Sequence, residues 1–512
     1  MKNWHVVASA VCFTSASSVL LASSFSLLPA LLVLGGVAAV NILFAGGNFG
    51  AALQRPVEWR WLATCAAVAL LLTLLGGEGH LFFSKDDWLG RDAVLADLVG
   101  RSMPVLYHHE GGDFILRAPL GMYLFPAAIG RIAGLPAAHL AMAAQTTGLL
   151  STFFYAVTLV WPRGRLAFIF LFVCFSGLDT IPVLLKTGAA SLLRVPAFWV
   201  DIGYFPPNLA QFFWAPPHAL PGWWFAALAG LYVRREIDLA ALAAASLPLL
   251  LWSPLALMGG VLIFIPLALL SPREIARPRV ALACMCAAGF LPVLAYLRAG
   301  AEDVPHRLQV FDEGFLDQYL LLVIFGLTQI AVVFLFWKRI EAWFRPVLAI
   351  SVILLLLIPL FNMGYMNDVT QRVSIAPRAL LAFGYNALLI ECFVSRAWLA
   401  LASGALVFLI GAISPALELY DTLTTPRFSI SDCNLLTVYR KHNHDRYLPT
   451  YIAPVESFPS WLFPAGPQKA ALEVETRLCW PDRIYGEKLF NWLKPENRIW
   501  LRAPSPQELA EP

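Results

Sequence analysis

Long runs of uncharged, apolar residues are the feature that most restricts how this chain can fold. An α-helix needs about 20 apolar residues to cross a bilayer, and many runs here approach or exceed that length. Charged residues make up only 13% of the chain and hydrophobic residues 59%, whereas soluble domains carry roughly 25% charged residues. A membrane β-barrel would show alternating segments of about ten residues instead. The sequence therefore predicts an all-α polytopic membrane protein.

The apolar runs predict about 11–14 transmembrane helices. The candidate spans are 5–24, 27–45, 61–77, 137–160, 166–178, 218–233, 238–251, 254–271, 279–298, 318–337, 346–361, 378–394 and 397–413.

Charge divides the connecting segments into two sets. Short loops rich in arginine and lysine, such as 55–60 and 273–279, belong in the cytoplasm by the positive-inside rule. The longer segments alternate with them, so we assign these to the exoplasmic side, the periplasm in a Gram-negative bacterium. The expected organisation is a transmembrane domain over 1–413 and a small exoplasmic (periplasmic) domain over 414–512, in a bacterial inner (plasma) membrane. The exoplasmic segments are 78–136, 179–217, 299–317, 362–377 and the tail from 414.

Cysteine usage adds one structural expectation and one exclusion. Cys433 and Cys479 stand in the polar tail and can form a disulfide if the tail is extracytoplasmic. The other six cysteines lie in apolar spans, where cysteine packs as a small hydrophobe. The chain has no CxxC pair, P-loop, GxGxxG or HExxH motif, so nothing indicates zinc or nucleotide chemistry. We expect no nucleic-acid partner.

The first exoplasmic loop holds the densest group of acids. Asp86 and Asp87 open a predicted helix over 87–100 that is amphipathic enough to lie in the membrane interface. Either acid can simply cap the helix, and Asp87 can pair with Arg91 one turn later. Alternatively, one carboxylate acts as a general base on an acceptor hydroxyl. Asp92 is the next candidate, whereas Asp97 and Asp113 are expected to be solvated.

The segment after these acids carries a resemblance to a known family. An apolar span, an acidic loop with an interfacial helix and the short segment Pro119-Leu120-Gly121-Met122-Tyr123-Leu124 follow one another. This order resembles the membrane-embedded glycosyltransferases of the GT-C superfamily. The resemblance implies a GT-C-like fold with exoplasmic interfacial helices, a polyprenyl-phosphate sugar donor and an essential aspartate in the first exoplasmic loop. That aspartate maps onto Asp86 or Asp87. In the family, a basic residue on a late exoplasmic loop holds the lipid phosphate.

Basic residues of the later exoplasmic segments are candidates for that phosphate site. An arginine fork can hold two phosphate oxygens at once, and Arg372 is the first choice, although it can also form an ion pair with Asp368. The second exoplasmic segment ends at His218, which either lines a cavity or is a core histidine bonded to a carbonyl. Further candidates for donor phosphate binding are Lys186, Arg194 and Arg378, and those for the cavity or acceptor are Asp179, His218, His108, His109, Tyr123 and Asp368.

The sequence thus predicts an inverting glycosyltransferase acting on a glycan, lipid or protein acceptor at the exoplasmic face of the membrane. The acid pair Asp86–Asp87 can bind Mg²⁺ or Mn²⁺, so a metal requirement stays open. One alternative is a transporter or flippase for a lipid-linked saccharide, which would place ionisable groups inside its spans. A second is an O-antigen-type polymerase or ligase, which would use loop arginines and histidines. A third is a non-catalytic scaffold.

Overall fold

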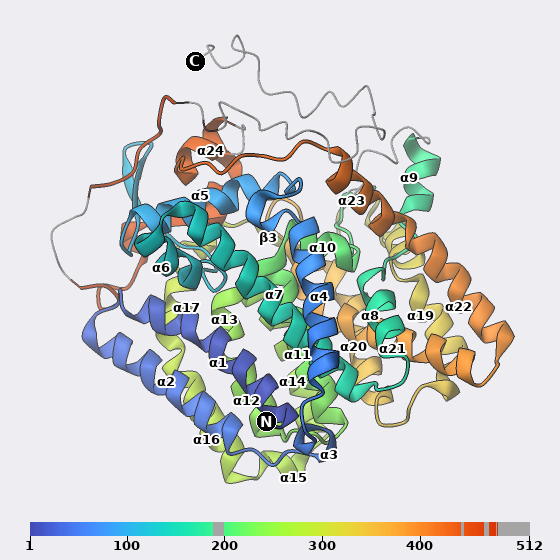
Figure 1. Cartoon of the computed structure of the whole chain (residues 1–512). Coiled ribbons are helices and arrows are strands. Elements are labelled where there is room, and N and C mark those ends of the chain that lie inside the picture. Colours follow the sequence, from blue (N-terminus) through green and yellow to red (C-terminus); the bar gives the residue numbers. More distant parts are fainter. Residues whose placement is uncertain (188–198, 442–444, 465–469, 478, 480–512) are drawn as a thin grey trace.

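The protein is built almost entirely of helices, with two small sheets (Figure 1). The computed structural model describes residues 1–512 except 188–198, 442–444, 465–469, 478 and 480–512. Among the described residues, five helices are long and apolar enough to cross a membrane, and up to seven if each of two bent pairs is one span. The five are α1 (Asn3–Ala22), α2 (Leu27–Ala45), α7 (Leu135–Val160), α21 (Ile375–Val394) and Trp398–Thr424, which joins α22 (Trp398–Gly411) to α23 (Ile413–Thr424).

The bent pairs and the shorter apolar helices explain why fewer spans meet the length criterion than the 11–14 predicted. Prolines and local breaks divide several apolar runs; α12, for example, ends just before Pro248. The bent pairs are α16 (Pro278–Gly289) with α17 (Leu291–Arg298), at 45°, and α18 (Phe315–Leu321) plus the π-turn η4 (Leu322–Gly326) with α19 (Thr328–Leu335), at 59°. The shorter apolar helices are α4 (Trp59–Leu75), α6 (Leu124–Ala133), α12 (Leu239–Ser246) with α13 (Leu249–Trp252), α14 (Pro254–Leu269) and α20 (Arg345–Leu357) with η6 (Ile358–Leu360).

The remaining elements connect these helices or pack between them. The α-helices are α3 (Ala51–Gln54), α5 (Asp87–Gly100), α8 (Arg165–Val173), α9 (Thr180–Thr187), α10 (Asn208–Trp214), α11 (Pro216–Val233), α15 (Pro272–Ile275) and α24 (Leu435–Lys441). The single turns are η1 (Glu78–His80), η3 (Ala301–Asp303), η5 (Trp337–Arg339), the π-turn η7 (Val369–Val373), η8 (Asp445–Thr450) and η9 (Val455–Ser457). The strands are β1 (Leu106–His109), β2 (Gly112–Leu116), β3 (His306–Leu308), β4 (Phe361–Met363) and β5 (Ile452–Pro454).

The short basic loops meet at one end of the molecule. α3 and α15 lie at that end, beside the N-terminus (Figure 1). The Glu236 carboxylate accepts hydrogen bonds from the backbone N–H groups of Ala52 and Leu53, at 2.9 and 3.1 Å. Arg165 forms an ion pair with Glu58 at 2.6 Å. These contacts join three loops that charge alone had assigned to a single side.

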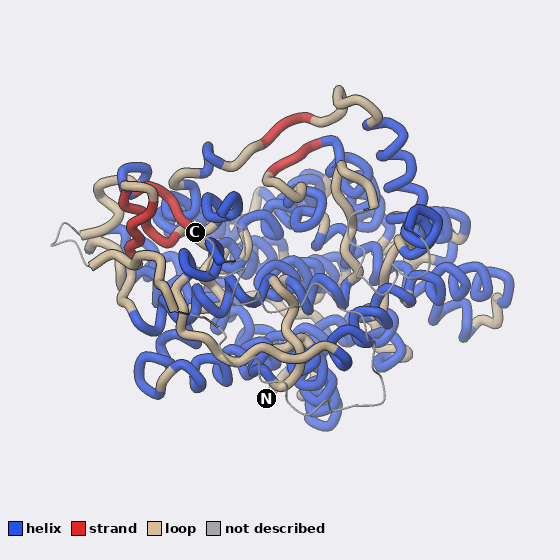
Figure 2. Tube along the Cα trace, turned by 90° about the horizontal axis from the view of Figure 1, so that it is seen from above, coloured by secondary structure: helices blue, strands red, loops and turns tan. Residues whose placement is uncertain are grey.

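The long segments meet at the opposite end. β2 of the first long loop pairs with β5 of the tail. β3, in the segment 299–317, pairs with β4 at the start of the next long segment. Both pairs are antiparallel. Figure 2 looks at the molecule from this end and shows the two sheets lying apart at the edge of the helices. The Gln309 side chain also donates to the carbonyl of Ile202 at 3.0 Å. The first long loop is therefore tied to the tail. The other three long segments are likewise tied to one another.

Helix α5 begins and ends where the sequence predicts, at Asp87 and Gly100, but it does not lie open at an interface. Every residue from Trp88 to Leu98 is buried. Tail helix α24 covers it so closely that a β-carbon at Gly90 would lie 2.7 Å from the Tyr439 ring. The spacing of apolar residues therefore predicted the helix correctly. The same spacing gave no sign that the tail covers the polar side of α5.

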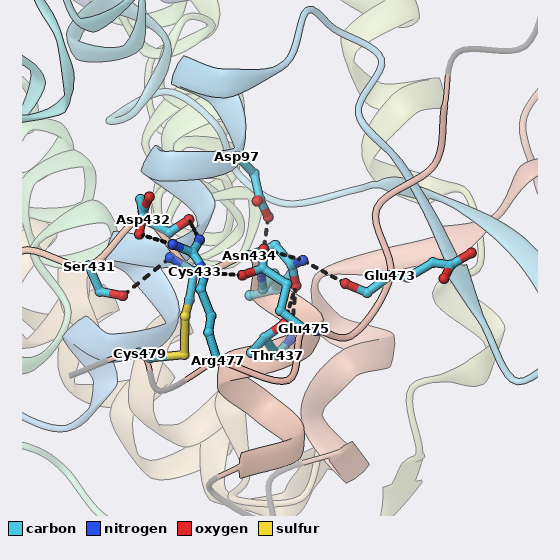
Figure 3. Close-up of a disulfide and its surroundings, with 11 residues drawn as sticks. Asp97, Ser431, Asp432, Cys433, Asn434, Thr437, Glu473, Glu475, Arg477 and Cys479 are labelled. Atoms are coloured by element: carbon cyan, nitrogen blue, oxygen red, sulfur yellow. Dashed lines mark hydrogen bonds and ion pairs between the residues drawn. A yellow bond between two sulfur atoms is a disulfide. The ribbon is translucent and has the colours of Figure 1, made fainter. Parts of the chain in front are cut away.

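The tail is fastened to α5 at Leu435, the first residue of α24. Close to this point a disulfide joins Cys433 to Cys479 (Figure 3). The Asp97 carboxylate accepts hydrogen bonds from the Leu435 N–H at 3.0 Å and from the Tyr107 hydroxyl at 2.7 Å. Asp97 is therefore buried, and the expectation of a solvated side chain was wrong. The buried side chains of α24 belong to the same hydrophobic core as the long helices.

Replacing Asp97 by asparagine is expected to flatten the dependence of stability on pH. Burial raises the pKa of Asp97 to about 7, above its unfolded value of about 3.9. Its stabilising contribution is therefore complete below pH ~4 and is lost as the pH rises toward ~7, by about 1.4 kcal/mol per pKa unit. The test is the melting temperature in detergent from pH 5 to 8, which should fall less for Asp97→Asn than for the wild type. Asp201→Asn, at an exposed position, should follow the wild type; a parallel decline in all three proteins would contradict the assignment.

Candidate functional site

The first turn of α5 places one carboxylate against one buried guanidinium. Asp87 accepts a hydrogen bond from Arg91 Nη2 at 3.0 Å, and its side chain is 50% exposed. Arg91 is itself buried and donates through Nη1 to the carbonyl of Trp214. Asp86 is the N-cap residue of α5, yet its side chain makes no capping hydrogen bond. The ion pair with Arg91 therefore fixes the carboxylate of Asp87.

Tyr204, in the loop between α9 and α10, lies among the charges of three separate elements. Burial raises the pKa of its phenol, and the negative charges of Glu418, Asp87 and Asp179 raise it further. The positive charge of Arg378 acts in the opposite sense. Tyr204 is therefore within electrostatic range of an acid from the first long loop and of an arginine nearly three hundred residues later.

Arg378, in the first turn of α21, is a buried arginine with an unsatisfied guanidinium. The residue is 1% exposed, and none of its three guanidinium nitrogens has a hydrogen-bond partner among the described residues. Its charge lies over the rings of Phe175 and Phe205, 5.7 and 6.0 Å from their centroids. An unpaired buried charge is costly, so these N–H groups are suited to an anionic ligand.

The negative charge of Asp179 acts on Arg378. Burial raises its pKa, while the charge of Arg378 and the hydrogen bond from Trp199 lower it. Trp199 Nε1 donates to one carboxylate oxygen at 3.0 Å, and the other oxygen has no partner among the described residues. Asp179 and Arg378 therefore influence one another without being hydrogen-bonded.

Arg372 lies in the π-turn η7, directly before α21. The wide turn interrupts regular helix geometry, as π-turns frequently do at functional sites. Arg372 forms the ion pair with Asp368 that the sequence left open, at 3.2 Å. It is nevertheless within electrostatic range of His218, as is Arg91. His218 Nδ1 is hydrogen-bonded to the Ser253 hydroxyl at 2.8 Å rather than to a carbonyl.

The Tyr204 loop and the Arg372 turn are locked together. The Asn367 amide donates to the carbonyl of Ile202 at 2.6 Å. Gly203 has a φ of +121°, which side chains rarely tolerate, and a β-carbon there would lie 3.0 Å from Thr370. This close packing fixes two long segments relative to one another and so fixes the groups they carry.

A buried ion cluster anchors the start of α5 to α23. The Lys85 ammonium is 2.9 Å from the Glu418 carboxylate and 2.6 Å from that of Asp421. Lys85 and Glu418 are almost completely buried. Trp214 Nε1 donates to Glu418 at 3.2 Å, so the cluster also holds the residue whose carbonyl accepts from Arg91.

Replacing Lys85 by methionine is expected to destabilise the protein by about 3 kcal/mol, because two acids would then be buried without their cation. The measurement is unfolding of the purified protein in detergent. Lys338→Met is the matched control, because Lys338 is exposed at a turn and its loss should change little. Equal stability of the two variants would contradict a structural role for the cluster.

Asp92, the third predicted catalytic acid, lies on the buried side of α5 with two histidines. Its carboxylate is 3.3 Å from His80 Nε2 and 3.8 Å from His139 Nδ1. Burial raises its pKa to about 6, although the charges of His80 and Arg91 lower it. These three residues have the spacing of metal ligands, and the pair Asp86–Asp87 predicted for Mg²⁺ or Mn²⁺ is not part of the group.

The remaining predicted site residues form two groups, one close to Asp87 and Arg91 and one away from them. Tyr123 is buried and lies within electrostatic range of Arg91 and Asp87. His108 and His109 stay within the β1–β2 hairpin, where they face Asp113 at 2.8 Å and Glu110 at 3.8 Å. Lys186 is exposed, 3.4 Å from the carbonyl of Trp199, and Arg194 lies outside the described residues.

Sequence reasoning missed several buried or partly buried polar residues of this region. Tyr204 stands among many aromatic residues that look like a membrane-interface belt, and Glu418 lies in a helix that continues past the boundary set at 413. His80 follows an apolar span and His139 begins the next. A small clue was available for the histidines, since an ionisable residue at the end of a span tends to line a polar site.

Neither a known protein family nor a curated protein matches the chain, and no solved structure matches it.

Proposed function

We propose that this protein is a membrane-embedded, inverting glycosyltransferase of the GT-C type that uses a polyprenyl-phosphate sugar donor. The observation that carries the proposal is the buried guanidinium of Arg378, none of whose nitrogens has a hydrogen-bond partner among the described residues. This guanidinium can hold a phosphate, and the partly exposed carboxylate of Asp87 can take a proton. The charges of both residues act on Tyr204, so we propose that they serve one site.

In this proposal Asp87 is the general base. The acceptor hydroxyl would give its proton to the Asp87 carboxylate as its oxygen forms a bond to the anomeric carbon of the donor. The bond between that carbon and the phosphate oxygen breaks, and the polyprenyl phosphate leaves with the electron pair. Attack from the face opposite the phosphate inverts the anomeric centre. The Arg91 guanidinium, which donates to Asp87, holds the carboxylate in position.

Arg378 is the residue we assign to the departing phosphate. Its N–H groups have no partner among the described residues, so a phosphate would supply the acceptors they lack. Negative charge builds up on the phosphate as the bond breaks, and a fixed guanidinium stabilises it without reorganisation. Arg372 would assist from the π-turn, since its charge and that of Arg91 reach the same histidine.

The disulfide supports an exoplasmic position for this end of the molecule, because disulfides persist in oxidising compartments. Cys433 and Cys479 belong to the tail, which is joined to the first long loop. We therefore propose that the site faces the periplasm from a bacterial inner membrane, with the polyprenyl chain among the membrane lipids. The acceptor is a glycan, lipid or protein.

Transfer activity tests the proposal directly. Purified full-length protein in liposomes should release polyprenyl phosphate and form a glycoside from at least one member of a panel of polyprenyl-phosphate-linked hexoses and pentoses, with simple glycosides as acceptors. Movement of a fluorescent lipid-linked saccharide between leaflets, without release of polyprenyl phosphate, would instead identify a flippase. Arg378 lies in the first turn of α21 rather than at its middle, which supports an enzyme over a transporter.

A further inference from the structure

Three buried side chains from three separate elements converge beneath α5. His80 ends the turn η1, Asp92 lies in the middle of α5, and His139 lies in the second turn of α7. They are 8%, 2% and 1% exposed. The proposed transfer reaction uses none of the three, and no short sequence motif links them.

The hydrogen bonding of His80 sets the direction of its lone pair. Its Nδ1 lies 3.1 Å from the carbonyl oxygen of Phe428. A carbonyl can only accept, so Nδ1 carries a proton and donates it. In the neutral ring the lone pair is then on Nε2, which faces the other two residues. A backbone carbonyl that holds a histidine in this way is the usual outer support of a metal ligand.

The distances between the facing atoms are close to those between neighbouring ligands of one metal ion. His80 Nε2 is 3.2 Å from His139 Nδ1 and 3.3 Å from Asp92 Oδ2. The other Asp92 oxygen, Oδ1, is 3.8 Å from His139 Nδ1, and one ligand atom from each of the three residues lies within 4.8 Å of the other two. Zinc bonds of about 2.0–2.1 Å at tetrahedral angles place neighbouring ligands about 3.4 Å apart.

The charges around this group also favour a cation. The Asp92 oxygen nearer His139 has no hydrogen-bond partner among the described residues. Glu78, a second buried carboxylate two residues before His80, likewise has one oxygen without a hydrogen-bond partner among the described residues. Arg91, the residue before Asp92, is hydrogen-bonded to Asp87 instead. A divalent cation would balance the two buried acids.

We propose that His80, Asp92 and His139 bind one Zn²⁺ ion, with a water molecule in the fourth position. Two imidazoles and one carboxylate suit zinc better than Mg²⁺, which prefers oxygen ligands throughout. The ion would tie η1 and α5 to α7. It would also support the tail, because the Arg427 guanidinium donates to the His80 carbonyl at 2.8 Å. Its role is to hold α5, and with it Asp87 and Arg91, in place.

Metal analysis of the wild-type protein tests this proposal without any sugar donor. Full-length protein purified in detergent without chelators should contain about one zinc per chain. Removal with a chelator should lower the melting temperature, and adding Zn²⁺ back should restore it, whereas Mg²⁺ should not. Protein that contains no zinc, and whose melting temperature is the same with and without added Zn²⁺, would overturn the zinc assignment.

Variants locate the ion. His139→Ala and Asp92→Asn should each reduce bound zinc at least about tenfold, whereas His306→Ala, which changes an exposed histidine, should retain it. Zinc retained by both cluster variants would overturn the assignment. If a cluster variant fails to fold, removal and restoration of zinc in the wild type decide the question.

Discussion

Replacing Arg378 by methionine should lower the rate of sugar transfer by about 10²–10³-fold while leaving the protein at least as stable as the wild type. The loss follows because one preorganised donor to a developing anion is worth about this much in rate. The unchanged or increased stability follows because the guanidinium is buried and has no hydrogen-bond partner among the described residues. Replacing such a charge with an apolar side chain of similar length removes a desolvation cost.

The two halves of this prediction are measured on the same preparation. Initial rates with a polyprenyl-phosphate donor give the catalytic effect, and thermal unfolding in detergent gives the stability. Arg378→Lys keeps the charge but loses the fork, so its rate should lie between those of the wild type and the methionine variant. Arg307→Met is the matched control, because Arg307 is largely exposed and paired with Asp312.

Two results would contradict the role of Arg378. Wild-type transfer rates in Arg378→Met would remove it from the phosphate site. A large loss of stability, together with the loss of activity, would show that the guanidinium supports the fold rather than the ligand. Loss of activity with unchanged or increased stability is the combination that only a ligand-binding arginine explains.

Asp87→Asn should lower the transfer rate by about 10²–10⁴-fold, because the amide cannot accept the proton of the acceptor hydroxyl. The amide keeps the size of the side chain and one oxygen that can accept from Arg91, so α5 should stay in place. Donor binding, measured separately by protection against thermal unfolding, should change little because the phosphate is assigned to Arg378.

Asp86→Asn is the comparison that decides between the neighbouring acids. Both residues are exposed, and Asp87 is paired with Arg91 and acts electrostatically on Tyr204. We therefore expect near wild-type rates for Asp86→Asn. The opposite order, with Asp86→Asn inactive and Asp87→Asn active, would move the general base to Asp86. Full activity in both variants would refute a base in this turn.

The sequence predicted those features that depend on local pattern. Apolar runs gave a helical protein with several candidate membrane spans. The acids before an apolar period of about 3.6 residues placed α5 at its observed bounds. Alternating loop charge grouped the segments that meet at each end. The two polar-tail cysteines, which the sequence left either free or paired, are bonded.

Predictions that depended on what covers a segment were less successful. Asp97 looked solvated because its own helix has no partner for it, yet the partner is the Leu435 N–H of the tail. Apolar composition also does not show where prolines and bends end a helix, so five helices among the described residues, or up to seven with the bent pairs, have the full length of a span and the other apolar helices are shorter. The burial of Asp97 and the ends of the helices both depend on packing against distant segments. The spacing of apolar residues along one helix does not contain that information.

The candidate site shows the same division. Residue types and topology alone indicated that an acid of the first long loop and an arginine before the last spans belong to one surface. Only the tertiary structure paired Asp87 with Arg91, buried Arg378 with no hydrogen-bond partner for its guanidinium among the described residues, and placed Tyr204 within electrostatic range of Asp87 and Arg378. It also moved Asp92 away from the proposed chemistry to His80 and His139. The reason is physical: membrane insertion is decided residue by residue along a helix, whereas a site is decided by side chains that packing brings together from distant parts of the chain.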